Sequence, residues 1–388
     1  MDDVIVVGAG PAGATAAMLL ARSGARVRVF DRATFPRPKL CGDTLNPGAM
    51  KVLSQHFSTT VILERSIPLD GMMLTGPDGV SVRGRYDHGL AGRAIERREL
   101  DVILIQQAVA AGASFDDGTS VSAPTLDGSG RVSGVRVKAR DGREQEIRAR
   151  LVVAADGRES RLARALGLLR HPARPRRWAI GGYFAGVDGL TTAGEMHIRR
   201  GHYIGVAPMP GKLANACLVV PQRSRGRELR QPAKALTRAL ASDPLLAPRF
   251  ARATLVGDPH ILGPMAVDAR AVGAPGLIAA GDAAGFIDPM TGDGLRFALV
   301  GAVLAAESAI DVLAGRLAVD AAPHRLAALR RRAFEAKWRF NRTLRGLVSS
   351  PAAVQAAAVG ARLLPVAFEA VIRYAGDCHL AGGSSDPS

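Results

Sequence analysis

Residues 4–13 read VIVVGAGPAG, an apolar run followed directly by a glycine-rich turn. The apolar run has the composition of a buried strand, and residues 14–23 continue as an amphipathic run typical of a helix. A second β-branched run, residues 26–30, ends at Asp31. A strand, a glycine turn, a helix and a second strand that ends in an acid are the pattern of a dinucleotide-binding βαβ unit.

The glycines of this turn have separate physical tasks. Gly8 allows the tight turn, Gly10 lets the backbone approach a pyrophosphate, and Gly13 lets the helix pack against the strand. The helix N-terminus offers free N–H groups and the positive end of its dipole to the phosphates. Asp31 is placed to accept both ribose hydroxyls of an adenosine. These residues alone are compatible with either NAD or FAD.

The bulk composition is that of a globular protein with two or three domains. The chain has 388 residues, of which 47% are hydrophobic and 22% charged. Its three cysteines include no CxxC pair, which favours a reducing compartment over a disulfide scaffold. The first apolar run is already the predicted strand, and no window of about 18 uninterrupted apolar residues occurs. We therefore expect a cytoplasmic protein without a signal peptide or a spanning helix.

The formal net charge of +16 has two interpretations. It can indicate an anionic neighbour, such as a membrane surface, nucleic acid or an acidic partner. It can equally reflect arginines spread along the whole chain, as a GC-rich genome would encode. We expect no nucleic-acid partner. We also expect no metal site, because His197 and His202 would face opposite sides of a continuous strand and no acidic cluster accompanies them.

Three further stretches have the pattern of a nucleotide site. The loop at residues 35–43, FPRPKLCGD, places two cations and a thiol close to the predicted cofactor. Residues 151–157, LVVAADG, form a buried strand that ends in an acid and a glycine. Residues 276–294, GLIAAGDAAGFIDPMTGDG, combine a buried strand, a Gly-Asp turn and a glycine-rich entry to a helix at 295–314. The N–H groups at that helix start would stabilise negative charge.

These stretches resemble the geranylgeranyl reductase family, a branch of the FAD-dependent superfamily that also contains the aromatic-ring (class A) flavoprotein monooxygenases. The loop is similar to the family's FPRxKxCG signature, residues 155–160 to the superfamily's ADGxxS motif, and residues 289–294 to its PxTGxG motif. The resemblance spans residues 4–294, about three quarters of the chain. It implies bound FAD rather than NAD.

The resemblance implies an α/β fold, with a Rossmann-like FAD-binding domain of the p-hydroxybenzoate-hydroxylase-like type, an inserted antiparallel β-sheet substrate domain and a helical C-terminus. The expected FAD-binding domain is discontinuous and comprises residues 1–71, 93–165 and 255–320. The expected substrate domain comprises residues 72–92 and 166–254, and a basic helical region follows at 321–388.

The resemblance also implies which residues bind the cofactor. Asp282 would accept hydroxyls of the flavin's ribityl chain, and the N–H groups of residues 292–294 would face the N1–C2=O edge of the flavin. The implied cofactor-binding residues are Gly8, Gly10, Ala12, Gly13, Asp31, Arg32, Arg37, Cys41, Gly42, Arg98, Asp156, Gly157, Gly281, Asp282, Pro289, Gly292 and Gly294.

Two of these assignments have alternatives that the sequence leaves open. The resemblance places Cys41 near the isoalloxazine, but a small buried cysteine would give the same sequence. Arg98 matches the superfamily's arginine that contacts the flavin nucleotide at the start of a helix, but it can also be an exposed arginine at that helix start. Cys41, Tyr203 and His202 are the candidate catalytic residues, with His88 as a further candidate.

The predicted substrate sheet departs from the family. Prenyl reductases carry a YxWxFP-like motif there, whereas residues 203–208 read YIGVAP and lack its tryptophan and phenylalanine. The WxWxIP motif of flavin-dependent halogenases is also missing. We narrowly favour hydroxylation of a hydrophobic phenolic, quinonoid or polyketide-type lipid through a flavin C4a-hydroperoxide. The alternatives are reduction of C=C bonds in a prenyl or polyketide chain and, third, a non-catalytic prenyl-lipid carrier of the GDI type.

The expected partners follow from this interpretation. NAD(P)H would act as a transient reductant, because no second GxGxxG motif occurs, and a separate reductase is the alternative. Residues 323–345 are strongly basic with interleaved apolar residues at helical spacing. Such a helix can lie on an anionic membrane at the inner face of the cell, or it can pack one face and expose the other to solvent. Residues 351–375 form an apolar helical pair that is packed or faces lipid, and not a span.

Overall fold

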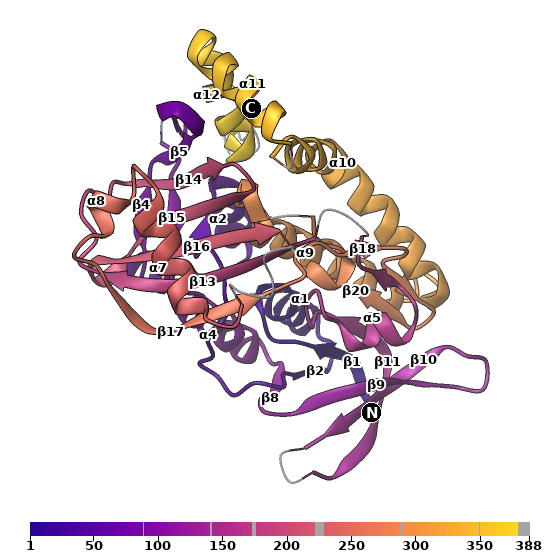
Figure 1. Cartoon of the computed structure of the whole chain (residues 1–388). Coiled ribbons are helices and arrows are strands. Elements are labelled where there is room, and N and C mark those ends of the chain that lie inside the picture. Colours follow the sequence, from indigo (N-terminus) through magenta and orange to yellow (C-terminus); the bar gives the residue numbers. More distant parts are fainter. Residues whose placement is uncertain are drawn as a thin grey trace.

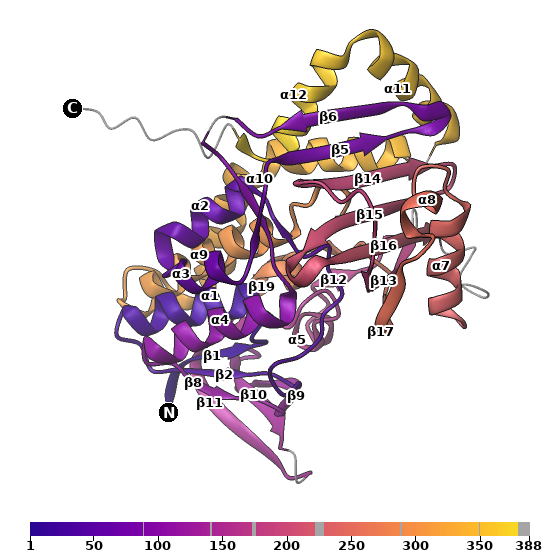
Figure 2. The same ribbon diagram turned by 90° about the vertical axis from the view of Figure 1, so that its left-hand side faces the viewer.

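The structure is a computed structural model that describes residues 1–87, 89–139, 142–172, 176–221, 229–287, 289–348 and 350–378. Two large sheets lie side by side, and a run of C-terminal helices extends along one side of both (Figures 1 and 2).

The first sheet has eight strands and a parallel centre. β1 pairs in parallel with both β2 and β11, so the carboxyl ends of these strands meet at one edge. In spatial order the strands are β19 (Gly273–Ala274), β20 (Leu277–Ala279), β11 (Glu144–Ala154), β1 (Asp2–Val7), β2 (Val27–Phe30) and β8 (Ser114–Asp116), with β10 (Val132–Lys138) and β9 (Ser120–Leu126) paired onto β11 as an antiparallel excursion.

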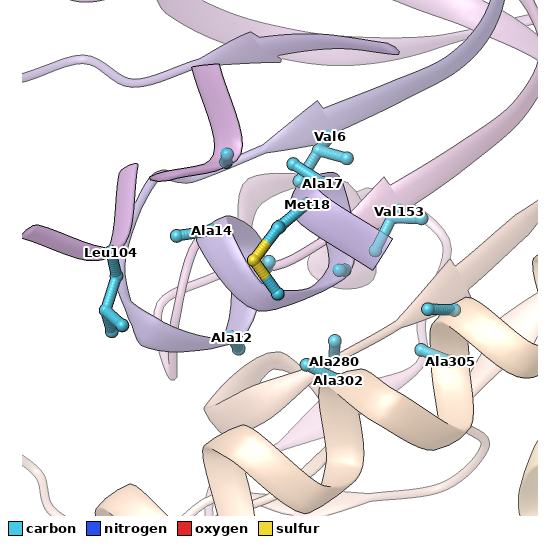
Figure 3. Packing of buried hydrophobic residues seen from close by; sticks show 14 of the residues in the cluster. Val6, Ala12, Ala14, Ala17, Met18, Leu104, Val153, Ala280, Ala302 and Ala305 are labelled. Carbon is cyan, nitrogen blue, oxygen red and sulfur yellow. The ribbon is translucent and has the colours of Figure 1, made fainter. Parts of the chain in front are cut away.

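Helices cover this sheet and close its core. α1 packs between α4 and α9, and small alanine side chains on α1 and α9 let these two helices approach each other around Met18 (Figure 3). The helices of this half are α1 (Pro11–Arg22), α2 (Pro47–His56), α3 (Thr60–Glu64), α4 (Arg97–Ala110), α5 (Arg161–Ala165) and α9 (Gly294–Leu313).

The turn between β1 and α1 requires glycine for steric reasons. Gly8 has a φ of +97°, and a Cβ on it would collide with the carbonyl oxygen of Ala155. A Cβ on Gly13 would collide with the carbonyl oxygen of Gly8. The first turn of α1 therefore lies directly against the end of β1, and its N-terminus points past that end.

The second sheet has seven strands and carries two helices on one face. All its pairs are antiparallel except β14 with β5. In spatial order the strands are β17 (Thr254–Leu262), β13 (Arg177–Ala185), β16 (Leu213–Pro221), β15 (His202–Met209), β14 (Ala193–Arg199), β5 (Gly71–Thr75) and β6 (Ser81–Arg85). α7 (Pro232–Ser242) and α8 (Ala247–Phe250) cover its outer face through an apolar cluster that includes Leu236 and Phe250.

The remaining elements connect or flank these layers. α10 (Ala322–Val348) packs on α9 and leads to the helix pair α11 (Pro351–Leu363) and α12 (Pro365–Ala375), which lies over β6. The small sheets contain β3 (Thr44–Leu45), β7 (Gly92–Ala94) and β4 (Ile67–Leu69), and β12 (Leu169–Arg170) with β18 (Asp268–Ala269); the 3-10 turns are η1 (Pro77–Gly79), η2 (Pro210–Lys212), η4 (Gly281–Ala284), η5 (Pro289–Thr291) and η6 (Val319–Ala321).

The fold class predicted from the sequence is confirmed, with a Rossmann-like half, an antiparallel substrate sheet and C-terminal helices. One expected boundary differs from the observed pairing. Residues 255–320 were assigned to the nucleotide-binding domain, but β17 pairs with β13 in the second sheet. The sequence analysis assigned no strand to residues 254–262, and no local pattern there indicates a pairing with β13.

Candidate active site

A cavity of about 600 Å³ lies between the two large sheets. Its polar end is formed by the carboxyl edge of the parallel sheet, and its apolar end by the inner face of the second sheet. The segments that line it include the β1–α1 turn, loop residues 37–44, residues 155–161, η4, the start of α9, and parts of β13, β14, β15 and β16.

The glycine turn lines the polar end. Gly8, Gly10 and Ala12 all border the cavity. A Cβ on Gly10 would have the Nη2 atoms of Arg37 and Arg97 as its nearest neighbours, at 3.6 and 3.9 Å. The missing side chain therefore leaves room in the cavity instead of relieving a clash with the protein. A phosphate group fits such a cradle at a helix N-terminus.

Asp31 is fixed at the edge of the cavity by backbone groups. Its Oδ2 accepts a hydrogen bond from the N–H of Ala9 at 2.8 Å, and its Oδ1 accepts one from the N–H of Ala33 at 2.9 Å. Arg37 lies 3.7 Å from Oδ2. Each carboxylate oxygen retains capacity for a further donor, so two ribose hydroxyls can be accommodated, and that contact stays a prediction. Arg32 also lines the cavity.

The middle of the cavity is strongly cationic. Arg37, Lys39, Arg97 and Arg158 all line it. Burial, followed by the positive charges of Arg97 and Arg158, lowers the pKa of Lys39 to about 8. Burial raises the pKa of Asp282, while Lys39, Arg158 and Arg97 act in the opposite direction. Closely spaced cations of this kind are suited to the pyrophosphate of a dinucleotide.

At the start of α4, the arginine that lines the cavity is Arg97 and not the expected Arg98. Arg97 donates to Asp101 through Nε at 2.8 Å and through Nη2 at 2.9 Å, and it is buried. Arg98 points away, is half exposed, and pairs with Glu96 at 2.8 Å. Neighbouring helix residues point about 100° apart, so a shift of one residue moves a side chain from the cavity to solvent.

Asp156 and Gly157 lie at the carboxyl end of β11, as the sequence indicated. Asp156 Oδ2 accepts from the N–H of Arg161 at 2.9 Å, and burial raises the pKa of this carboxyl. Gly157 has a φ of +83° and leads to Arg158. Among the described residues, the buried Nε of Arg158 has no hydrogen-bond partner. This orphaned donor on the cavity wall fits an anionic ligand.

The glycines of the third stretch also border the cavity. Gly281 has a φ of +59°, and a Cβ on it would lie 2.8 Å from the Cβ of Ala12. Cβ atoms on Gly292 and Gly294 would have as their nearest neighbours only the side chains of Thr44, at 4.0 Å, and Phe286, at 3.6 Å. These two glycines therefore open onto the cavity where α9 begins.

Pro289 opens the turn η5, but its side chain lies outside the described residues. His88 lies outside them as well. Gly42 and Cys41 line the cavity beside Thr44, so the loop at 35–43 does reach the predicted flavin end.

The apolar end is a wall of aliphatic and sulfur-containing side chains. Tyr203 lines the cavity, is only 2% exposed, and has the guanidinium of Arg177 over its ring at 5.7 Å from the ring centre. Flexible thioether side chains adapt to irregular hydrophobic ligands. The apolar wall residues are Ala179, Met196, Val219, Leu262, Met265, Phe286 and Met290.

His202 is not part of this wall, so its expected catalytic role is wrong. Successive residues of a strand point to opposite faces, and Tyr203 takes the face toward the cavity. His202 borders a separate groove on the α7 side, together with Arg199 and Asp243, and burial lowers its pKa.

Next to Cys41 lies a buried hydrogen-bonded cluster of Asp43, Tyr183 and Asn215, which we call the acid cluster. Asp43 is fully buried, and its Oδ2 accepts from the hydroxyl of Tyr183 at 2.6 Å and from Nδ2 of Asn215 at 2.6 Å. The same amide donates to the carbonyl oxygen of Cys41 at 2.9 Å. Burial raises the pKa of Asp43 to about 7, although Tyr183, Asn215 and Arg97 oppose the shift.

The sequence analysis missed this cluster. Asp43 stood within the quoted loop, and its place two residues after Cys41 was a usable signal. Tyr183 and Asn215 come from β13 and β16, and nothing local marks them. Burial also raises the pKa of the Cys41 thiol, while Arg97 acts to lower it.

The chain matches the FAD binding domain family over residues 1–338. It belongs to this family. The glycine cradles, the cationic middle and Asp31 fit the dinucleotide, so the chain binds FAD as an FAD-dependent oxidoreductase. The non-catalytic carrier considered from the sequence is not supported by this membership.

Two curated relatives indicate the branch of the family to which the chain belongs. The chain is 32% identical over 321 residues to digeranylgeranylglycerophospholipid reductase 2 of Methanopyrus kandleri, covering 80% of this chain and 77% of that protein. It is 33% identical over 316 residues to menaquinone reductase of Mycolicibacterium smegmatis, covering 79% and 75%. The chain therefore belongs to the geranylgeranyl reductase branch that the sequence resembled.

Solved structures share the fold. A geranylgeranyl bacteriochlorophyll reductase-like protein from Thermoplasma acidophilum has a TM-score of 0.78 and 22% identity, covering 94% of this chain and 98% of that one. A myxobacterial chondrochloren halogenase has a TM-score of 0.82 and 22% identity, covering 100% and 98%. Identities this low report the architecture and not the reaction.

The contrast between Arg97 and Arg98 gives a test of the site. We expect Arg97→Gln to weaken FAD binding by about tenfold to a hundredfold, because it removes a charge-assisted hydrogen-bond donor from the cavity. Arg98→Gln, one residue along the same helix, is the matched control and should leave affinity unchanged. Titration of apoprotein with FAD, followed by flavin fluorescence, measures both. Equal losses of FAD affinity in the two variants would contradict the placement of Arg97 in the cavity and Arg98 outside it.

The raised pKa of Asp43 predicts how stability depends on pH. Between about pH 4 and pH 7 the native carboxyl keeps a proton that the unfolded chain has released, so the free energy of unfolding falls as pH rises. In Asp43→Asn this contribution is absent. The free energy of unfolding of the apoprotein, measured by urea denaturation, should therefore fall less steeply with rising pH in this variant.

Asp293, whose pKa burial also raises to about 7, contributes equally to both proteins. Asp127→Asn serves as the control, because hydrogen bonds from Ser129 lower the pKa of this exposed acid and place its effect below that window. Identical slopes for wild type and Asp43→Asn would refute the assignment.

Proposed function

We propose that the chain reduces carbon–carbon double bonds in the isoprenoid chain of a hydrophobic lipid. The observation that carries the proposal is the acid cluster, which joins the cavity-lining Cys41 to the sheet that bears the apolar wall. The two relatives act, by their names, on a digeranylgeranyl glycerophospholipid and on menaquinone. An apolar wall built largely of aliphatic and methionine side chains suits a long flexible chain of that kind.

Saturating a C=C bond needs a hydride on one carbon and a proton on the other. FAD, when bound and reduced, supplies the hydride equivalent. The chain must supply the proton and exclude water from the reacting carbons. Cys41 lines the cavity, and burial keeps its thiol protonated by raising its pKa. After it donates the proton, the thiolate is stabilised by Arg97 and by the backbone N–H of Asp43.

Asp43 and its two donors hold Cys41 in place. The amide of Asn215 joins the carbonyl oxygen of Cys41 to the carboxyl of Asp43, and Tyr183 fixes that carboxyl from the second sheet. The loop that carries the thiol is thereby tied to the wall that would hold the substrate. In this proposal Asp43 is a positioning residue and Cys41 the proton donor.

The electrons come from outside the chain in this proposal. NAD(P)H is the transient donor, since the resemblance that identified the family implies it, and a separate reductase is the alternative source. Either donor delivers two electrons per double bond.

Hydroxylation is the second candidate, and one observation favours it. The strand that would carry the tryptophan and phenylalanine of prenyl reductases has Gly205 and Ala207 at these positions of the YxWxFP pattern. Gly205 lines the cavity, so the wall is more open there than a tryptophan would leave it. This reaction would use O₂ and insert one oxygen atom into a phenolic or quinonoid substrate.

One experiment separates the two reactions. The FAD-loaded protein is supplied with NADPH or dithionite and a panel of prenyl and alkyl-phenol lipids, with and without O₂. We expect a product that gains two hydrogens under anaerobic conditions. A product formed only in air and carrying ¹⁸O from ¹⁸O₂ would establish hydroxylation instead.

The role of Cys41 has its own test. We expect Cys41→Ser to retain FAD and to lower the rate of double-bond reduction by about 10²–10⁴-fold, the usual range for losing a general acid. Cys378→Ser is the control, because Cys378 does not line the cavity. Flavin reduction by the electron donor, measured by absorbance, should be normal in both. Normal turnover by Cys41→Ser would remove the thiol from the mechanism.

A further inference from the structure

The junction of α11 and α12 lies at one end of the molecule (Figures 1 and 2) and exposes a cluster of apolar side chains. We call residues 359–366 the elbow. Leu363, Leu364 and Val366 are 74%, 64% and 71% exposed, and Val359 is 48% exposed. Isolated exposed apolar residues are ordinary on protein surfaces, whereas four within eight residues mark a contact site.

The opposite face of this helix pair is firmly packed. Ala358, Ala361 and Ile372 are buried against Val80 and Val82 of the β5–β6 hairpin. The elbow is therefore the outward side of an amphipathic unit that the fold holds in place. Its apolar residues are exposed although the opposite face of the same helix pair is fully packed.

The shape of the elbow excludes a simple span. Among the described residues no single helix is long and apolar enough to cross a membrane. The segments Ala352–Leu363 and Val366–Ala375 reach that hydropathy only together, and they are bent by 116°. A bent apolar pair of this kind can enter one leaflet as a wedge, with its flanks at the headgroups.

Exposed cations flank the elbow. Arg362 and Arg373 are exposed on its two helices, which carry one exposed acid, Glu369. Arg373 also lies 3.6 Å from the exposed carboxylate of Asp87. The preceding helix α10 adds a basic surface with one exposed acid, Glu335, among its cations. The exposed arginines of that surface are Arg325, Arg331, Arg332, Arg339 and Arg342. Cations beside an apolar wedge are complementary to anionic lipid headgroups.

The elbow is also connected to the cavity. Met72 of β5 packs against the cluster that supports the elbow and lines the cavity on its other side. Gly194 makes room for it, because a Cβ there would lie 2.7 Å from the Met72 sulfur. One side chain thus separates the base of the elbow from the substrate wall.

We infer that the elbow inserts into the surface of an anionic lipid bilayer and that the arginines of α10 and α11 hold it there. This deepens the proposed function, on which it rests, by placing the active-site cavity beside the bilayer that would contain a lipid substrate. A second copy of the chain is the competing occupant of the same apolar surface.

The test uses the FAD-loaded full chain and vesicles without substrate. Sedimentation is compared for vesicles of phosphatidylcholine alone and of phosphatidylcholine mixed with phosphatidylglycerol. We expect binding to the anionic vesicles and at least about a tenfold weaker partition for a variant with three apolar side chains removed. That variant is Leu363→Gln, Leu364→Gln, Val366→Gln, and its matched control replaces exposed apolar residues elsewhere: Val61→Gln, Val109→Gln, Leu126→Gln.

Several outcomes would overturn the inference. Wild-type protein that fails to bind anionic vesicles at low salt, or an elbow variant that binds as well as the control, excludes insertion. A wild-type dimer that becomes monomeric in the elbow variant, without vesicle binding, assigns the surface to a second copy. Because binding is measured without turnover, a failed reductase assay beside intact vesicle binding would refute only the proposed reaction.

Discussion

The structure depends on how closely α1 approaches the end of β1. Gly13 lies on the carbonyl of Gly8, and Gly8 in turn lies on the backbone of Ala155. No side chain fits in either gap, so the end of β1, the start of α1 and the distant end of β11 converge at one edge of the parallel sheet. That convergence directs the N-terminus of α1 into the cavity, and the alanine-rich contact with α9 brings a second helix start to the same space.

The sequence predicted most of this half because its signals are local. A strand, a glycine turn and a helix fix one another over about fifteen residues, and the same holds where β11 and β20 end. Predictions that depended on a single residue's direction were less secure. Arg98 was expected where Arg97 lies. The sequence indicated an arginine at this helix start, but not which of two neighbouring arginines faces the cavity. His202 was expected in the wall, because strand parity could not be assigned before the strand's buried face was known.

The acid cluster could not be predicted for a different reason. Asp43 is 140 residues from Tyr183 and 172 from Asn215 in sequence, and it meets them only because the loop crosses from one sheet to the other. The pKa of Asp43 is raised because the side chain is buried where the loop meets the second sheet, and no feature of the local sequence indicates this burial. Cations dominate the adjoining cavity, while behind it burial raises the pKa of Asp43 to about 7. The two halves of the site are thus electrostatically different.

The parallel pair β14–β5 has a consequence for how the chain assembles. The edge of the substrate sheet is supplied by residues 71–85, which are made about a hundred residues before the strands they join. A fragment containing only β13–β17 would present β14 as an unpaired edge, with its hydrogen-bonding groups open to other chains. During synthesis the early hairpin must wait for its partner strand, and such delayed non-local pairing slows folding. The substrate half is therefore not a separable module, although its layers look like one.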